Sequence, residues 1–275
     1  MTLAQKLGYA PDARLLIVNC DDIGSSHAAN VASEAAMRHG LATSATLMVP
    51  CPWAREAVER FHDLDTGVHL TLTSEYPTYR WRGLTGAPGL RDDQGFLPRT
   101  AEALWQADPI DVEAECRAQI DQALAWGVDV THLDNHMGTL QLNARLFPIY
   151  VKLAREYRLP LRMASQSGDA RLGFGGRAQC DAAGVLYPDH FGFQWGTRTA
   201  GTFARYLDAP RTGVLETVLH PVRPGEELDA YDPKEKWIRE HDAAVGVDDV
   251  LRTKLDTAGI ERISFRPLRD AMRAQ

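Results

Sequence analysis

Two adjacent carboxylates, Asp21 and Asp22, follow the apolar run at residues 15–18 and precede Gly24. Like charges this close oppose each other's ionisation, and proteins normally keep isolated carboxylates in water. A nearby divalent cation would resolve the conflict, because it lets both acids remain ionised. The structural alternative is that the pair caps a following helix, since an acid at a helix N-terminus stabilises it by about 0.5–2 kcal/mol.

Polar residues also end three other apolar runs. His69 lies near the end of the run at 65–72, the letters THLDNH end the run that begins at residue 129, and His220 directly follows the run at 214–219. The carboxyl ends of parallel strands meet at one edge of a sheet, so these groups are expected to gather there. Taken alone, a strand-end histidine such as His69 is more often a hydrogen-bonded structural residue than a metal ligand. The coincidence across four strand ends is what indicates a site.

Strand alternation predicts a row of ligand-type side chains on one face. Residues two apart on a strand point to the same side, so His132, Asp134 and His136 are expected to share a face. Carboxylate supplies charge and neutral imidazole supplies nitrogen to a borderline divalent ion, which makes the row a candidate metal site. Four histidines in polar helical or loop segments are expected at the surface: His27, His39, His62 and His241.

A repeated alternation of short apolar runs and helical patterns must position these groups. Strands are expected at 15–19, 45–49, 65–72, 129–134, 161–163, 185–187, 214–219 and 262–265. Helices are expected at 28–39, up to about 61, at 109–127, 146–157 and 202–207, and across 233–258. In a chain of 275 residues this pattern predicts an α/β fold, with residues 1–275 forming a single-domain (β/α) barrel of seven or eight strands.

Two glycine-rich segments interrupt the pattern. Residues 74–100 contain many glycines and prolines, which is typical of a lid or a binding loop. Residues 167–177 lack the G-x-G-x-x-G order, so a nucleotide-binding loop is not favoured there.

Composition excludes several classes of partner. The formal net charge of −7, without a cluster of basic residues, argues against nucleic-acid and anionic-membrane binding. No apolar stretch approaches the ~20 residues of a membrane span, and the N-terminus lacks the pattern of a signal peptide, so a cytoplasmic location is expected. The four cysteines form no Cys-x-x-Cys pair and are expected to stay reduced.

The motifs together resemble a known family. The stretch NCDDIGSSHAANVASEAAMRHGLATSATLMVP, at 19–50, is similar to the opening signature of the YdjC-like carbohydrate deacetylases, which include the chitooligosaccharide deacetylases. GVHLTLT, THLDNH and LHP match later signatures in the same order, so the resemblance covers residues 18 to about 221. It implies a distorted deacetylase-type barrel, related to the NodB-type polysaccharide deacetylases, that holds one divalent metal ion.

The resemblance also implies roles for individual residues. The implied metal ligands are Asp22, His69 and His136. Asp21 would be the general base and His220 the general acid, and Arg162 is a candidate to orient Asp21. Further residues are expected behind the ligands or near the substrate: His132, Asp134, Arg162, Asp189 and His190.

The implied reaction is hydrolysis of an N-acetyl group on an amino sugar or short oligosaccharide, with release of acetate. A divalent ion would polarise the acetamide carbonyl and lower the pKa of water from 15.7 towards about 7, while a base and an acid move the protons. Two imidazoles and one carboxylate suit Zn²⁺ best, and Mn²⁺, Fe²⁺, Co²⁺ or a water-rich Mg²⁺ site stay open.

The sugar itself is not specified. This chain reads HMGTLQ after Asn135, whereas many chitooligosaccharide-active members continue with further histidines. Hydrolysis of an O-acetyl ester or another amide is an alternative, and so is a non-catalytic sugar-binding barrel, although a binding module needs no base and acid. The expected partner is a small carbohydrate, not nucleic acid or membrane, and a homodimer is compatible with this function.

Overall fold

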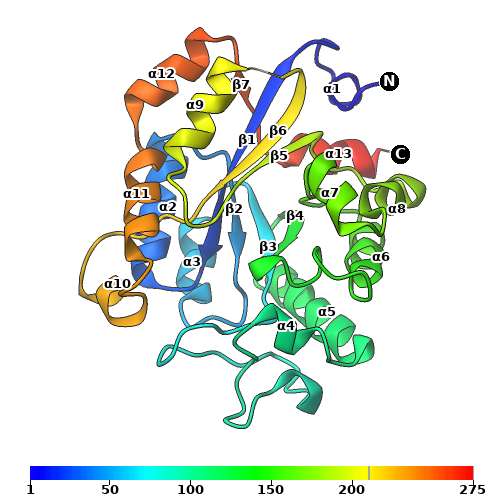
Figure 1. The fold of residues 1–275 in the computed structure, drawn as a ribbon, viewed down its shortest axis with the longest axis vertical. Coiled ribbons are helices and arrows are strands. Elements are labelled where there is room, and N and C mark those ends of the chain that lie inside the picture. The colour runs from blue at the N-terminus through cyan, green and yellow to red at the C-terminus, as the bar shows by residue number, and fades with distance from the viewer. Residues whose placement is uncertain (210, 275) are drawn as a thin grey trace.

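The computed structural model describes residues 1–209 and 211–274 and contains a curled sheet with helices packed around it (Figure 1). All pairings between its strands are parallel, and the order is β4-β3-β2-β1-β6-β5, with β7 pairing to β1. The strands are β1 (Arg14–Ile23), β2 (Ser44–Leu47), β3 (Thr66–Leu70), β4 (Val130–Asn135), β5 (His190–Gly192), β6 (Gly213–Leu219) and β7 (Glu261–Arg262).

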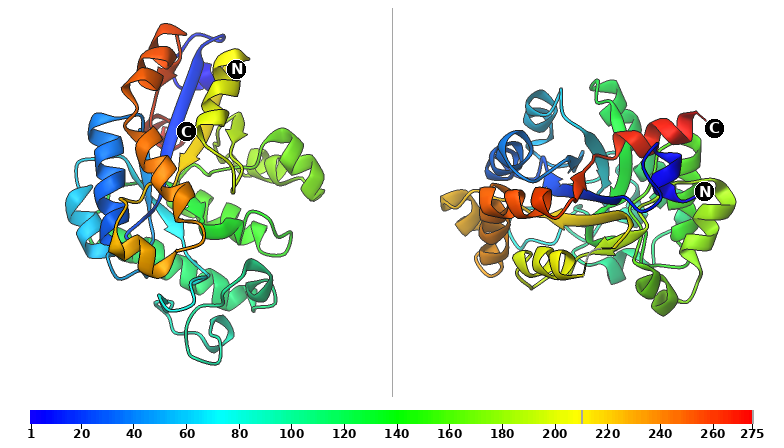
Figure 2. Two further views of the ribbon diagram at one scale, coloured as in Figure 1. Left: turned by 60° about the vertical axis from the view of Figure 1, so that its left-hand side comes forward. Right: turned by 90° about the horizontal axis from the view of Figure 1, so that it is seen from above.

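The helices surround the sheet, as the view along it shows (Figure 2). They are α1 (Leu3–Lys6), α2 (His27–His39), α3 (Ala54–Arg60), α4 (Ala101–Leu104), α5 (Pro109–Ala125), α6 (Phe147–Tyr157), α7 (Gln166–Leu172), α8 (Gly176–Ala183), α9 (Ala200–Asp208), α10 (Glu226–Tyr231), α11 (Lys236–Gly246), α12 (Asp249–Thr257) and α13 (Arg266–Arg273), with short 3₁₀ turns η1 (Pro88–Leu90) and η2 (His136–Gly138). In the described part of the chain, none of these helices is both long and apolar enough to cross a membrane.

Burial explains why the central strand is a continuous apolar run. Every residue of β1 after Arg14 is buried, as expected for a parallel strand whose two faces are both covered. The strand therefore carries Asp21 and Asp22 into the interior, and only Ile23 follows them before the strand ends. The two acids were expected to come after the strand, but both belong to β1.

The predicted α/β barrel is confirmed in a curled form that closes only irregularly. The strands predicted at 161–163 and 185–187 are wrong: Leu161 makes only an isolated bridge to Leu133, and its N–H donates to the carbonyl of Leu186 over 3.0 Å. Pro160 and Pro188 flank these segments, and proline has no N–H to give to a strand ladder. Leu133 exchanges two hydrogen bonds with the first segment, to the carbonyl of Pro160 and from the N–H of Arg162, and no strand pairing among the described residues closes the sheet between β4 and β5.

The segment at 74–100 is irregular apart from η1, as predicted, and lies beyond the carboxyl ends of the strands (Figure 1). The buried carboxylate of Glu115 on α5 fixes it, because it accepts hydrogen bonds from the backbone N–H groups of Leu84 and Thr85, each over 2.8 Å. This anchoring makes the segment a fixed wall above the sheet.

Candidate active site

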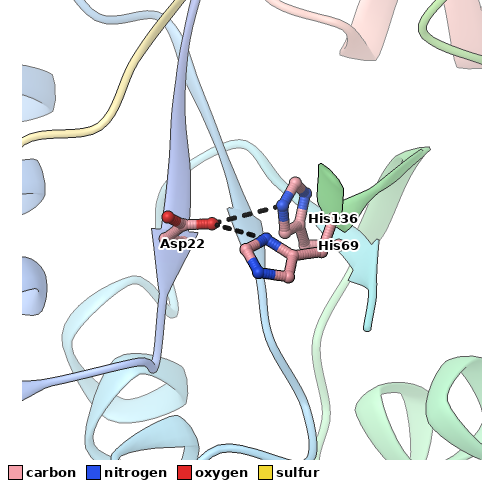
Figure 3. A group of neighbouring side chains, drawn as sticks. All are labelled: Asp22, His69 and His136. Atoms are coloured by element: carbon pink, nitrogen blue, oxygen red, sulfur yellow. Dashed lines mark ion pairs between the residues drawn. The ribbon is translucent and has the colours of Figure 1, made fainter. Parts of the chain in front are cut away.

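Three side chains from separate strand ends converge at the mouth of the curled sheet. Asp22 comes from β1, His69 from β3 and His136 from the residue after β4 (Figure 3). Oδ1 of Asp22 lies 3.2 Å from Nε2 of His69 and 3.3 Å from Nδ1 of His136. The group is buried and has the composition of a metal site.

The backbone aims Asp22 at this point. Asp22 adopts a left-handed conformation, with φ 66°, which is uncommon for a residue other than glycine and costs energy. Gly24 follows with φ 89°, and its N–H donates to Oδ1 of Asn30 over 2.6 Å, which fixes the turn into α2. The strand therefore ends in a turn that points the second acid away from the first.

Each histidine is oriented by a carboxylate behind it. Nδ1 of His69 donates to Oδ1 of Asp134 over 2.5 Å, and Nε2 of His136 donates to Oε2 of Glu75 over 3.0 Å. These bonds leave the other nitrogen of each ring turned toward Asp22, where it could bind a metal ion once it has lost its proton. Carboxylate–histidine pairs of this kind are the usual outer shell of a metal site.

Donor chemistry and an unsatisfied atom fit a divalent ion at this point. Oδ1 of Asp22 is buried and has no hydrogen-bond partner among the described residues. A buried carboxylate oxygen without a partner is costly, and an ion held by Asp22, His69 and His136 would satisfy it.

Asp21 is held apart from this group by Arg162. Nη1 and Nη2 of Arg162 donate to the two oxygens of Asp21 over 2.6 and 2.7 Å, a bidentate pair. Nη1 also lies 2.7 Å from Oδ2 of Asp134, and Nε donates to Oε1 of Glu216 over 2.7 Å. Arg162 lies beside Asp21 as the resemblance suggested, and it also touches two other buried acids.

His220 follows β6 and faces Asp21. Its Nε2 lies 3.7 Å from Oδ2 of Asp21, and its Nδ1 lies 3.9 Å from Oδ2 of Asp242. The ring of Trp195 packs edge-on to it at a centroid distance of 5.0 Å. His220 therefore lies at the carboxyl end of β6, one of the four strand ends at which the sequence predicts site residues.

Most of these groups line one cavity of about 460 Å³, and the fully buried Asp134, Glu216 and Asp242 do not. Asp21, Asp22 and His220 form part of its floor. The remaining walls are largely aromatic and apolar, and they include Tyr76, Met137, Leu142, Phe191, Phe193 and Trp195.

Three residues expected near the site lie elsewhere. His132 stacks on Phe265 at 3.8 Å, so only His136 and, through His69, Asp134 join the site from the predicted row. Asp189 accepts the backbone N–H of Val214 at the amino-terminal start of β6, and His190 contacts the carbonyl of Thr212 there. Asp189 and His190 do not line the cavity, although Phe191 and Phe193, which follow them in the chain, do.

Sequence reasoning missed the charged residues Glu75, Glu235 and Arg239, which line the cavity, and the buried Glu216 and Asp242, which contact Arg162 and His220. Glu216 lies inside the apolar run at 214–219, but it is two positions from Val218 and four from His220, both of which line the cavity. That alternation is a signal that could have found it. Glu75 and Arg239 come from an irregular segment and from α11, and local patterns carry no signal for them.

Burial and neighbouring charge shift several pKa values. Burial alone would raise the pKa of Asp21, but the Arg162 guanidinium outweighs it and holds the pKa at about 2. Burial lowers the pKa of His69, yet Asp134 and then Asp22 raise it to about 9. Likewise Glu75 and Asp22 overcome burial and raise the pKa of His136 to about 10. Without a metal ion, the surrounding carboxylates therefore favour the protonated, positively charged form of His69 and of His136.

A family model described as YdjC-like protein matches residues 15–257, which is most of the chain. The chain belongs to the YdjC-like family.

This YdjC-like protein has relatives that are named carbohydrate deacetylase. One from Geobacillus stearothermophilus is 31% identical over 92% of this chain and 97% of its own length. One from Thermus thermophilus is 44% identical over 61% of this chain, a match that spans 60% of that relative.

Solved structures support the fold of the YdjC-like chain. A protein of Enterococcus faecalis, described as a candidate cellobiose-phosphate cleavage protein, superposes with a TM-score of 0.81 over 93% of this chain and 99% of its own, at 24% identity. An uncharacterised protein of Agrobacterium tumefaciens superposes with a TM-score of 0.54 over 93% of this chain and 89% of its own, at 12% identity.

Metal binding is expected to expel protons. Imidazole must be neutral to bind a metal ion, and with pKa values of about 9 and about 10 both His69 and His136 are protonated at pH 7 in the metal-free protein. Metal affinity should therefore rise with pH up to about 9–10, and about two protons should leave per ion at pH 7. Calorimetric titration with Zn²⁺ in two buffers of different ionisation enthalpy measures this number.

The matched control is His190→Gln, which lies away from the cavity and should leave the proton count unchanged. Binding of Zn²⁺ without proton release would contradict the assignment of both histidines to the ion.

Proposed function

We propose that this chain is a metal-dependent carbohydrate deacetylase, which hydrolyses the N-acetyl group of an amino sugar or short oligosaccharide and releases acetate. The observation that carries the proposal is the placement of Asp22, His69 and His136 beside a separate carboxylate, Asp21, in one cavity. Relatives that span nearly the whole chain are named carbohydrate deacetylase, which supports the same activity. Residues 1–275 are proposed to act as one catalytic unit.

The proposed ligands are Asp22, His69 and His136, with Asp134 and Glu75 orienting the two rings. An ion bound there would act as a Lewis acid toward the acetyl carbonyl and would make water more acidic. Two imidazoles and one carboxylate favour Zn²⁺, with Mg²⁺, Mn²⁺, Co²⁺ and Fe²⁺ as alternatives for the titration to compare.

Asp21 is proposed as the general base. The Arg162 guanidinium holds its pKa at about 2, so the carboxylate is ionised at neutral pH and can accept a hydrogen bond from the attacking water. A carboxylate with so low a pKa is a weak base, so proton transfer to it would depend on a bound ion making that water more acidic. Arg162 binds both oxygens and so fixes the direction in which Asp21 receives that proton.

His220 is proposed as the general acid. It lines the same cavity as Asp21, and its Nε2 lies 3.7 Å from Oδ2 of Asp21, within reach of a nitrogen that leaves as water attacks. Burial lowers the pKa of His220, so the protonated form is a strong donor to a basic amine. Asp242 accepts the backbone N–H of His220 over 2.8 Å and so fixes the backbone at this residue.

Location and assembly are finer proposals. We propose a cytoplasmic location; the four cysteines are free and buried, which suits a reducing compartment. The homodimer stays a prediction.

The direct test of the proposed function is elemental analysis of the purified protein followed by an acetate-release assay. N-acetylglucosamine and its di- and oligosaccharides are compared with O-acetylated sugars. We expect one metal equivalent and faster acetate release from the N-acetyl sugars. Preference for O-acetyl sugars would favour an esterase, and acetate release from neither after metal loading would favour a sugar-binding barrel.

The division of labour between the two acids is tested by Asp21→Asn. Loss of the base should lower turnover by about 10²–10⁴-fold while the metal content stays near one equivalent. Asp189→Asn is the matched control, because its carboxylate caps the start of β6 away from the cavity, and it should retain turnover. Loss of metal in Asp21→Asn would instead assign Asp21 as a ligand.

A further inference from the structure

Arg239 on α11 contacts the second oxygen of the proposed metal ligand. Its Nη1 donates to Oδ2 of Asp22 over 3.0 Å, while Oδ1 of Asp22 faces His69 and His136. Arg239 is 4% exposed, so this is a buried, desolvated cation beside a candidate cation site. The two oxygens of one carboxylate therefore have different partners.

Other contacts fix the guanidinium in this position. Nε of Arg239 donates to Oδ2 of Asp232 over 2.9 Å, and Nη2 donates to the hydroxyl of Tyr76 over 2.5 Å. The ring of Trp195 lies over it at 5.4 Å. With Nε, Nη1 and Nη2 each committed, Arg239 is not free to move to the other oxygen of Asp22.

A cation whose only task was to neutralise Asp22 would gain most from a bidentate pair, as Arg162 makes with Asp21. Arg239 instead takes one oxygen and leaves the other buried without a hydrogen bond. It also repels a divalent ion at this distance, which weakens metal binding. This arrangement favours an open coordination position on the ion at the expense of metal affinity.

We propose that Arg239 is a positioning residue that reserves Oδ2 of Asp22, so that Asp22 offers a single oxygen to the ion and a coordination position stays open for water or substrate. The inference rests on the proposed function only in that Asp22 is taken as a metal ligand. It adds Arg239 of α11 to the metal centre, a residue that the motifs at the strand ends do not include.

The test is Arg239→Met, which removes the donor and the charge. The protein is stripped with a chelator and titrated with Mn²⁺ alone. We expect the Mn²⁺ dissociation constant to fall, because both oxygens become available and the repulsion is lost. Removing a residue that supports a metal ligand usually weakens binding by about 10–100-fold, so a fall would distinguish this role from simple support of Asp22. Water-proton relaxation should show fewer exchangeable waters on bound Mn²⁺, and kcat should fall with little change in KM.

Controls separate this effect from a general loss of structure. Arg239→Lys keeps the charge and a donor, and it should bind Mn²⁺ nearly as the wild type does. Arg269→Met removes another buried arginine, which pairs with Asp129 and Asp270 away from the cavity, and it should not alter Mn²⁺ affinity. Arg239→Gln replaces the methionine variant if that does not fold, with the same tightening expected.

Unchanged or weaker Mn²⁺ binding in Arg239→Met, or tighter binding with no loss of water, would each overturn the proposal. These measurements need no substrate. A wild-type protein that released no acetate would therefore refute the proposed activity and still leave the role of Arg239 testable.

Discussion

The arrangement of the site depends on one buried cation, Arg162. Its guanidinium touches three carboxylates in the floor of the curled sheet, those of Asp21, Asp134 and Glu216. Three acids without a partner could not stay ionised there, because desolvation disfavours the charged form. Burial raises the pKa of Glu216 to about 7 even with Arg162 in contact, which shows how strong that penalty is. Arg162 therefore allows three buried carboxylates to lie together in this part of the sheet.

The same cation links the two halves of the proposed chemistry. Through Asp21 it holds the proposed base, and through Asp134 it reaches His69, whose other nitrogen faces Asp22. The repulsion between Asp21 and Asp22 is reduced because their carboxylates point in different directions and because each contacts an arginine. Asp21 turns to Arg162, whereas the left-handed backbone of Asp22 turns its carboxylate toward the histidines and Arg239. A metal ion then needs to satisfy only the oxygen that no arginine holds.

The parts that were predictable follow from one geometric rule, that parallel strands end at a common edge. This rule brought together Asp21, Asp22, His69 and His220. The fold was predictable for a second reason, because long apolar runs indicate parallel strands that are covered on both faces. The rule fails where contacts come from other elements. Arg239 reaches the site from α11, and nothing in the local pattern of a helix near the end of the chain indicates a partner on β1. The segments at 161–163 and 185–187 are apolar, which favours strands, but Leu161 makes only an isolated bridge to Leu133 and no ladder forms.

The central claim is that the adjacent acids have separate tasks, Asp22 at the ion and Asp21 at Arg162. A crystal structure of the Mn²⁺-loaded protein, with anomalous scattering to locate the ion, tests it most directly. We expect one ion in contact with Oδ1 of Asp22 and with the rings of His69 and His136, and Asp21 still bound by both terminal nitrogens of Arg162. A second group of ligand-type atoms, formed by Asp21, His69 and Asp134, lies in the same floor. An ion in that group, with Arg162 displaced, would contradict the account.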